Sequence, residues 1–426
     1  MYPKISTNLI EENYESAKEI YGSYGIDTEG VLEKMKLIPI SVHCWQGDDV
    51  TGFEPGKESL SGGGILATGN FPGKARNADE LRMDLEKVFS LVPGKHRLNL
   101  HAIYAETGGK QVDRDELQPE HFSGWIKWAK KNKIGLDFNP TVFSHPLADS
   151  GFTLSSKDSK VRNFWIRHVR ASRKIAMEMG KQLKSPCINN LWIPDGSKDL
   201  PADRMTPRKI LKESLDTIYE EKLDPNYILD SVESKLFGIG SEAFVVGSHE
   251  FYMGYAVENK LMLCLDSGHF HPTEDISDKI SSVLNFTDRL LLHLSRGVRW
   301  DSDHVVTMND QILSIALEVK RSKVLDRVHF ALDFFDASIN RIIAWIIGIR
   351  AALKSILRAI LEPTEILIEV ENEGKYGERL ALMEEFKSLP FGAVWDMYCL
   401  QNNVPAGSAW LDDVEEYSKN IILVRK

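Results

Sequence analysis

The stretch KLMLCLDSGHF, residues 260–270, shows the pattern that decides the fold. A short run of apolar residues ends in the polar residues Asp266 and His269, and a helical pattern follows over residues 274–285. Apolar residues at most positions are typical of a strand that is buried on both faces. A strand of this kind followed by a helix predicts one unit of a parallel sheet.

The same pattern occurs seven more times along the chain. The other apolar runs are LIPISVHCW (37–45), HRLNLHAIY (96–104), IGLDFNPTV (134–142), CINNLWIP (187–194), NYILDSVESKLF (226–237), RLLLHLSRG (289–297) and RVHFALDFFD (327–336). Helical patterns lie between them, at 78–91, 117–132, 159–183, 206–222, 241–258 and 309–323. Eight units predict an α/β fold, a closed (β/α)8 TIM barrel, with a doubly wound open sheet as the alternative.

Three segments extend this barrel. Residues 1–35 form a helical, amphipathic N-terminal segment, and residues 47–78 form a Gly-rich connection of the length expected for a lid or binding loop. A strong helix over 339–361 is followed by further helical segments. We therefore predict a barrel over 1–340 and a C-terminal helical extension over 341–426 that takes part in subunit contacts.

Composition and charge exclude several classes of protein. The chain of 426 residues carries 52 Lys and Arg against 62 Asp and Glu, a net charge of −10, which argues against a nucleic-acid or anionic membrane surface. The most apolar run, IIAWIIGI (342–349), is far shorter than a membrane span. The four cysteines form no CxxC pair and the N-terminus has no signal-like apolar region, so a cytoplasmic location is expected.

Polar residues stand near the end of each predicted strand. They are His43 and Trp45, His101, Asp137 and Asn139, Asn189 and Trp192, Glu233 and Lys235, Asp266 and His269, His293, and Asp333 with Asp336. In a parallel barrel these ends meet on one face, the face that carries active sites. We therefore predict that these side chains converge on a single site.

Seven of the polar residues on or after the later strands point to bound metal. The segments VESK, LDSGHF and WDSDHV, together with strands seven and eight, supply Glu233, Asp266, His269, His293, Asp301, Asp303 and Asp333. Carboxylates this dense do not all stay ionised without cations. Oxygen and nitrogen ligands without thiolate suit Mn²⁺, Mg²⁺, Co²⁺ or Zn²⁺. Seven candidate ligands are too many for one ion and about right for two.

Long motifs resemble the L-rhamnose isomerase family. They are VESKLFGIGSE (232–242), LCLDSGHFHPTE (263–274), SRGVRWDSDHVV (295–306) and ALDFFDASINRIIAWIIG (331–348), with VHCWQGDD, LNLHAIY, GLDFNP and LWIPDG before them. The resemblance runs from about residue 5 to about residue 420. It implies a barrel related to xylose isomerase, a homotetramer, two divalent ions that are most often Mn²⁺, and interconversion of L-rhamnose and L-rhamnulose.

The resemblance also implies how the ligands are divided. The first ion corresponds to one held by Glu233, Asp266, His293 and Asp333. The second corresponds to one held by His269, Asp301 and Asp303, with Asp266 as a bridge. Gly297 departs from the Pro of the family pattern, and one extra Gly stands near Gly62–Gly64. Both differences affect loops and not the predicted ligands.

Four residues are predicted to be catalytic. Lys235 shares a strand face with Glu233 and is suited to stabilise negative charge on sugar O1. His101 is a candidate for opening the sugar ring by proton transfer. The other two are Asp301 and Asp333. A metal-assisted 1,2-hydride shift is favoured because the carboxylates are occupied as ligands, and an enediol route through a base is the alternative.

The substrate pocket should have an apolar part, because L-rhamnose carries a methyl group at C6. Trp192 and Phe138 are predicted to form its wall, and Val50, Leu60, Ile65 and Ile103 to surround the methyl group. One methyl group is worth about 1 kcal/mol, so discrimination against L-mannose, which has a hydroxyl group there, should be partial.

Other functions remain possible on these residues alone. A metal-dependent epimerase or aldolase on the same barrel would share the ligands, and its products would distinguish it. A barrel endonuclease would also gather metals, but the net charge of −10 and the lack of a basic strand-end face count against it. A sugar-binding module without catalysis would not need two metal sites.

Overall fold

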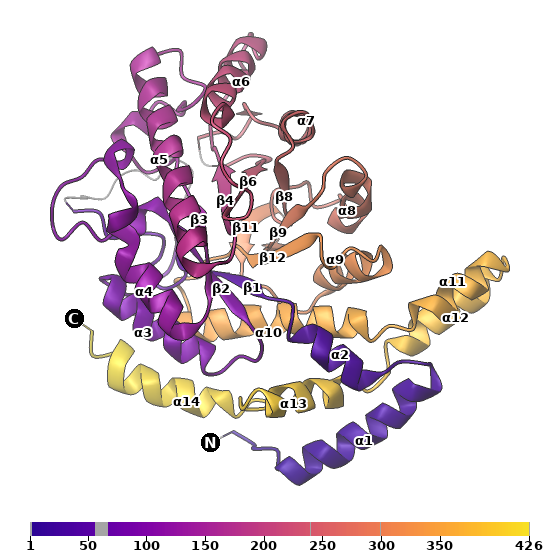
Figure 1. Ribbon diagram of the computed structural model, residues 1–426. Helices are drawn as coiled ribbons and strands as arrows, with labels where there is room; N and C mark the ends of the chain where they lie inside the picture. Colours follow the sequence, from indigo (N-terminus) through magenta and orange to yellow (C-terminus); the bar gives the residue numbers. More distant parts are fainter. Residues whose placement is uncertain (1, 56–66, 239, 299, 426) are drawn as a thin grey trace.

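A computed structural model describes residues 2–55, 67–238, 240–298 and 300–425. Eight parallel strands close into a barrel in chain order, which confirms the predicted fold (Figure 1). They are β1 (Ile40–His43), β2 (His96–His101), β3 (Gly135–Asn139), β4 (Cys187–Trp192), β6 (Ile228–Glu233), β8 (Met262–Asp266), β9 (Leu290–Leu294) and β12 (Val328–Leu332). Each strand lies within one of the eight predicted runs.

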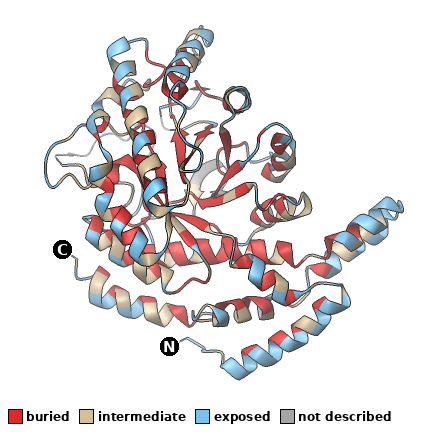
Figure 2. Cartoon of the chain, in the orientation of Figure 1, coloured by how far each residue is buried: buried red, intermediate tan, exposed pale blue. Residues whose placement is uncertain are grey.

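A helix follows each of these strands and covers the outside of the barrel (Figure 1). The helices are α3 (Ala78–Phe89), α4 (Ser123–Asn132), α5 (Ser159–Leu183), α6 (Met205–Tyr219), α7 (His249–Asn259), α8 (Ile276–Leu284), α9 (Asp310–Arg321) and α10 (Arg341–Ile360). Their inner sides are buried and their outer sides exposed (Figure 2), as amphipathic patterns require. Helix α7 begins later than predicted, because Phe244–Val245 form a short strand, β7, that pairs with β5 (Gly196–Ser197).

Helix α10 takes the place of the eighth barrel helix. It packs against α9 and α3, the helices that follow β9 and β1. The indole N–H of Trp345 donates to the carbonyl oxygen of His43 (2.9 Å), which ties α10 to the end of β1. The predicted division at residues 340 and 341 thus falls inside the eighth strand–helix unit.

Further helices lie outside this ring. They are α1 (Thr7–Ser23), α2 (Thr28–Met35), α11 (Thr364–Asn372), α12 (Tyr376–Phe386), α13 (Phe391–Gln401) and α14 (Trp410–Tyr417). Helix α1 packs against α13, so the two ends of the chain lie side by side, whereas α11 and α12 form a hairpin that projects from the body (Figure 1). Among the described residues, every helix is too short or too polar to cross a membrane.

A buried ion pair lies inside the barrel toward its N-terminal end. Asp137 on β3 accepts hydrogen bonds from Arg97 Nη2 (2.8 Å) and Nε (2.9 Å) and from the Ser41 hydroxyl (2.6 Å). Leu37 and Pro39, which precede β1, line the same small cavity. The prediction that Asp137 joins the polar cluster at the opposite end is therefore wrong, because Asp137 stands two residues before the last residue of β3 and faces a lower level of the barrel.

An antiparallel hairpin follows β9. It consists of β10 (Arg296–Val298) and β11 (Trp300–His304), which pair with each other outside the barrel. The predicted ligands Asp301 and Asp303 lie on β11. The segment WDSDHV therefore belongs to a hairpin that follows the seventh barrel strand and is not part of the barrel sheet.

Candidate metal centre

Four predicted ligands meet at the C-terminal end of the barrel. Glu233, Asp266, His293 and Asp333 come from β6, β8, β9 and the residue after β12, and their ligand atoms all lie within 4.8 Å of one another. His293 Nδ1 is 3.4 Å from Glu233 Oε2, 3.6 Å from Asp266 Oδ2 and 3.1 Å from Asp333 Oδ2. These side chains converge because alternate residues of each strand point into the barrel.

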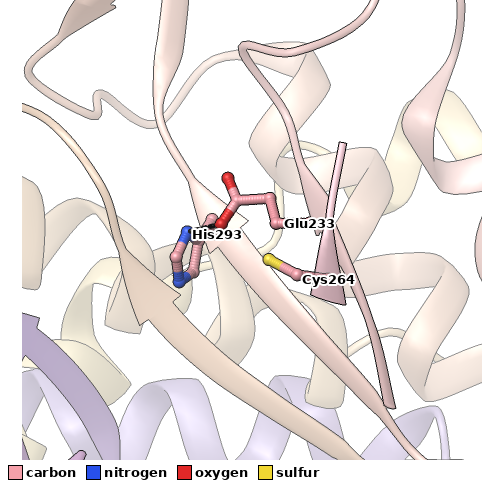
Figure 3. Close-up of side chains that lie close together, drawn as sticks. All are labelled: Glu233, Cys264 and His293. Atoms are coloured by element: carbon pink, nitrogen blue, oxygen red, sulfur yellow. Dashed lines mark ion pairs between the residues drawn. The ribbon is translucent and has the colours of Figure 1, made fainter. Parts of the chain in front are cut away.

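A thiol forms the floor of this cluster. Cys264 pairs with Glu233 in the register of β6 and β8, and its sulfur lies near Glu233 and His293 (Figure 3). It also packs with Met262, Leu291 and other apolar residues that fill the barrel below. Burial raises the pKa of the Cys264 thiol well above its ordinary value. Apolar side chains therefore fill the barrel directly below the cluster.

The cluster has the properties of a site built for a cation. Glu233, Asp266 and His293 are 2%, 1% and 1% exposed. Among the described residues, Asp266 Oδ2 and His293 Nε2 have no hydrogen-bond partner. Buried polar atoms left without partners are costly unless an ion or water satisfies them. The four residues therefore fit a divalent cation with oxygen and nitrogen ligands.

The charges of the cluster act strongly on one another. Burial by itself would raise the pKa of Glu233, but the imidazoles of His293 and His269 lower it below its ordinary value. Burial opposes a charged imidazole at His293, yet the nearby Cys264 and Glu233, with the carboxylates of Asp266 and Asp333, raise the pKa of His293 well above its ordinary value. The pKa of Asp333 is raised, chiefly by burial. These four side chains are therefore coupled electrostatically, and ligands of this kind bind a metal in their deprotonated form.

One further side chain braces the cluster. The amide of Asn190 on β4 donates a short hydrogen bond to Glu233 Oε2. Asn189 was the residue predicted from the sequence to join the site. Its amide instead donates to Asp230 Oδ1 (3.1 Å). The alternation of β4 contains the missed signal, since Asn190 shares a face with Trp192 and Asn189 does not.

The second predicted set lies beside the first. His269 Nδ1 is 3.0 Å from Glu233 Oε1 and 2.9 Å from the carbonyl oxygen of Ser234. Asp303 lines the same cavity as His269, Glu233 and Asp333. The backbone of Asp301 is part of β11, whereas its side chain is outside the described part of the structure.

The cavity above the cluster has a polar side and an apolar side. Glu233, Lys235, His269, Asp303 and Asp333 line the first, and Trp45, Val50, Phe143, Trp192 and Phe335 supply apolar surface, with His101 and Asn139 between them. The Lys235 ammonium lies 4.7 Å from the centre of the Trp192 ring, in cation–π contact. Gly238 makes room for this lysine, since a Cβ there would lie 2.5 Å from Lys235 Cε.

His101 is held on both sides of its ring. Its Nδ1 is 3.0 Å from the Thr141 hydroxyl, and its Nε2 is 3.4 Å from the Asn139 amide. That amide is better satisfied with its nitrogen donating to the carbonyl oxygens of Phe138 (3.1 Å) and Asn190 (2.9 Å). The amide oxygen then faces Nε2 and favours a proton on that nitrogen.

Two predicted substrate contacts lie elsewhere. Phe138 is fully buried and packs edge-to-face on Phe122, with ring centres 5.1 Å apart. Phe143, which was not among the predicted contacts, lines the cavity in its place and packs against Trp192. Ile103 is fully buried behind Gly52.

Of the four other predicted substrate contacts, two line the cavity and two are outside the described residues. Val50 and Trp192 line the cavity. Leu60 and Ile65 lie outside the described residues. A larger hollow of about 520 Å³ opens beside the loop after β8 and the start of α9, but no described ligand of the two sets lines it.

Comparisons with known proteins place the chain in a family. A family model described as L-rhamnose isomerase (RhaA) matches residues 8–425. L-rhamnose isomerase of Salmonella paratyphi A is 57% identical to the chain over 419 residues, which cover 98% of this chain and 100% of that protein. The enzyme of the same name from Salmonella typhimurium is also 57% identical over 419 residues, with the same coverage.

Solved structures show more distant similarity. An L-ribulose 3-epimerase superposes with a TM-score of 0.47 at 9% identity, over 78% of this chain and 98% of that chain. The family match, in contrast, extends over nearly the whole sequence. The chain belongs to the L-rhamnose isomerase family.

Proposed function

We propose that the chain interconverts L-rhamnose and L-rhamnulose and uses two divalent cations, most often Mn²⁺. As a member of its family, it is an aldose–ketose isomerase. The observation that carries the proposal is the cluster of the buried Glu233, Asp266 and His293 with the partly buried Asp333, whose ligand atoms lie within 4.8 Å of one another at the C-terminal end of the barrel.

The two cations would be held by chain residues already described. Glu233, Asp266, His293 and Asp333 would hold the first. His269, Asp301 and Asp303 would hold the second, with Asp266 as a bridge. When bound, the cations supply Lewis-acid polarisation of the sugar oxygens. Co²⁺, Zn²⁺ and Mg²⁺ suit the same oxygen and nitrogen ligands.

The cavity favours a hydride shift over proton abstraction. Among its described lining residues, the carboxylates are Glu233, Asp303 and Asp333, and all three belong to the ligand sets. With no carboxylate there to remove the C2 proton, we propose that hydrogen moves from C2 to C1 with its electron pair, as a proton moves between O2 and O1.

Two residues act on the sugar directly in this proposal. Lys235 donates a hydrogen bond to O1 and stabilises its negative charge as the carbonyl carbon accepts hydride. His101 exchanges a proton with the ring oxygen when the pyranose opens, and its contacts with Thr141 and Asn139 fix the ring plane for this transfer. Asp301 and Asp333 would act as ligands of the ions, next to the reacting end of the sugar.

The test is product formation from a panel of aldoses. L-Rhamnose deuterated at C2 should give L-rhamnulose that keeps the deuterium at C1 in ordinary water, which mass spectrometry and NMR detect. Loss of the label to solvent would support the enediol route. An epimeric aldose or a cleaved product would overturn the isomerase assignment.

Replacing Lys235 tests its role in charge stabilisation. Lys235→Met should lower kcat about 10²- to 10³-fold, because one donor at a developing oxyanion is worth that much, while metal content stays at the wild-type level. Gly238→Ala, which crowds the Lys235 side chain, should lower kcat less. Steady-state kinetics and metal analysis give both values, and a wild-type kcat for Lys235→Met would make the lysine a structural partner of Glu233.

Assembly and location are also part of the proposal. We propose a homotetramer in the cytoplasm. The four cysteines, Cys44, Cys187, Cys264 and Cys399, are all buried and unpaired with one another, which suits a reducing compartment. The −10 charge of the chain argues against nucleic acid or an anionic membrane as a partner.

A further inference from the structure

The turn directly after β1 contains two strained residues. Asp49 and Val50 have φ angles of 61° and 59°, in the left-handed region. This region is unfavourable for residues other than glycine, and for a β-branched residue such as Val50 it is exceptional. Such a conformation persists only where the surroundings impose it, and such strain concentrates at functional sites.

A buried carboxylate imposes the turn from within. Asp48 is fully buried, and its Oδ2 accepts a hydrogen bond from the Gly52 N–H (2.6 Å). Its Oδ1 accepts from the Tyr104 hydroxyl (2.7 Å). The Val50 N–H donates to the carbonyl oxygen of Trp45 (3.1 Å). Hydrogen bonds to Trp45 and Asp48 thereby hold the backbone on both sides of Val50.

An ion pair imposes the turn from α10. Arg341 is the first residue of α10, and its Nε and Nη2 donate to Asp49 Oδ1 (2.8 Å) and Oδ2 (2.7 Å). The two side chains are 4% and 18% exposed. A buried bidentate pair of this kind is strong and directional. It holds Asp49 in the conformation that sets the direction of the next residue.

The strained residue faces the sugar site. Val50 is half-buried and lines the cavity beside Trp45, Phe143 and Phe335, on the apolar side. A sugar whose C1 and C2 face the metal ligands presents its far end to that side. In a 6-deoxy sugar that end is a methyl group, and in the corresponding hexose it is a hydroxymethyl group.

We propose that Arg341, through Asp49, holds Val50 in its left-handed conformation so that the valine forms the apolar wall that selects a 6-deoxy sugar. The proposal rests on the proposed function and deepens it. Arg341 is a positioning residue, since it pairs with Asp49, which precedes the cavity-lining Val50, and does not itself line the cavity. Its effect should therefore appear in the choice between sugars, and the reacting end should be untouched.

The test is a double-mutant cycle read out as selectivity. Arg341→Lys keeps the charge and loses the bidentate geometry, and Val50→Gly removes both the strain and the wall. Each should lower the ratio of kcat/KM for L-rhamnose to kcat/KM for L-mannose about five- to tenfold, the range expected for a methyl contact. KM for L-rhamnose should rise in Arg341→Lys, whereas its kcat and metal content should stay near the wild-type values.

The double variant decides whether Arg341 works through Val50. Arg341→Lys in the Val50→Gly background should change selectivity no further, because two residues that act as one unit are not additive. Arg321→Lys is the matched control, since Arg321 makes a bidentate pair with Glu362 at the far end of α9 (2.8 and 2.6 Å), and it should leave selectivity unchanged. Additive effects, or equal losses for both sugars, would overturn the proposal.

A crystal structure of Arg341→Lys gives a readout without activity. Residues 49 and 50 should leave the left-handed region and Val50 should withdraw from the cavity. Val50 still at positive φ in that variant would overturn the positioning role. If the wild-type chain isomerises neither sugar, the proposed function fails, and this crystallographic result still decides the role of Arg341.

Discussion

Treatment with EDTA should abolish the isomerisation of L-rhamnose, and added Mn²⁺ or Co²⁺ should restore it. The ligand cluster is buried and keeps polar atoms without hydrogen-bond partners among the described residues, so it is incomplete without a cation. A polarising metal is worth several kcal/mol at the transition state, and each 1.4 kcal/mol is about tenfold in rate. We expect the metal-free chain to lose at least about 10³-fold in kcat.

The measurement compares kcat before chelation, after dialysis against EDTA with verified metal removal, and after each ion is added back. EDTA already saturated with Mn²⁺ is the control, and it should not inhibit. The melting temperature should rise on metal addition, because an ion that binds only the folded chain stabilises it by about 2.7 kcal/mol at 100 times its Kd. Full activity in a chain shown to be free of metal would contradict the proposed chemistry.

The barrel could be predicted because its signal is repeated and local. Eight apolar runs of strand length alternate with amphipathic helical stretches, and each run contains one observed strand. The ends of parallel strands then lie together as a consequence of the fold. The seven candidate ligands could therefore be expected on one face of the barrel, whereas the grouping of Glu233, Asp266, His293 and Asp333 came from the resemblance to the family.

The predictions for some individual side chains were wrong because successive residues of a strand point to opposite sides. Phe138 precedes Asn139 on β3, so the two face opposite sides, and only Asn139 lines the cavity. Asn189 and Asn190 exchange roles for the same reason. Asp137 has the inward parity but lies two residues lower, where Arg97 neutralises it. Parity gives a direction, whereas depth in the barrel depends on the stagger of neighbouring strands.

The positions of loop residues could not be predicted from the two-residue alternation of strands or the 3.6-residue repeat of helices. Ile103 lies in the short helix Ala102–Tyr104 directly after β2, so the alternation that positions His101 ends before it. Phe143 follows β3 in an irregular segment, and nothing in its sequence context marks it as part of the cavity. The hairpin of β10 and β11 depends on pairing between two short segments above the barrel, which apolar patterns do not report.

The two metal sites should be separable by mutation. Asp301→Asn combined with Asp303→Asn should empty the second site and leave the first largely occupied, because Glu233, Asp266, His293 and Asp333 are unchanged. The backbone should tolerate the exchange at 303, where φ is 43°, since asparagine accepts the left-handed region. The hydrogen bond from the Phe335 N–H to the Asp303 carbonyl oxygen (3.2 Å) is also kept.

The expected result is the loss of one ion per chain and a kcat lower by several orders of magnitude, with sugar binding retained. The second ion is the one that we assign to the reacting oxygens, and several kcal/mol of lost stabilisation correspond to about 10³-fold or more. Metal content, sugar affinity and kcat are measured on each variant. Asp310→Asn, on the first turn of α9, is the matched control and should behave as wild type.

Asp266→Asn should instead damage both sites. Asp266 Oδ1 accepts the Gly268 N–H (2.6 Å) and the Ser295 hydroxyl (3.0 Å), and an asparagine oxygen in that position would keep both bonds. Its nitrogen would then replace Oδ2, the atom 3.6 Å from His293 Nδ1, and an amide nitrogen is not a ligand for a divalent cation. If the Asp301 and Asp303 double variant keeps two ions and a near-normal kcat, or Asp266→Asn loses only one ion, the assignment of ligands to two bridged sites is wrong.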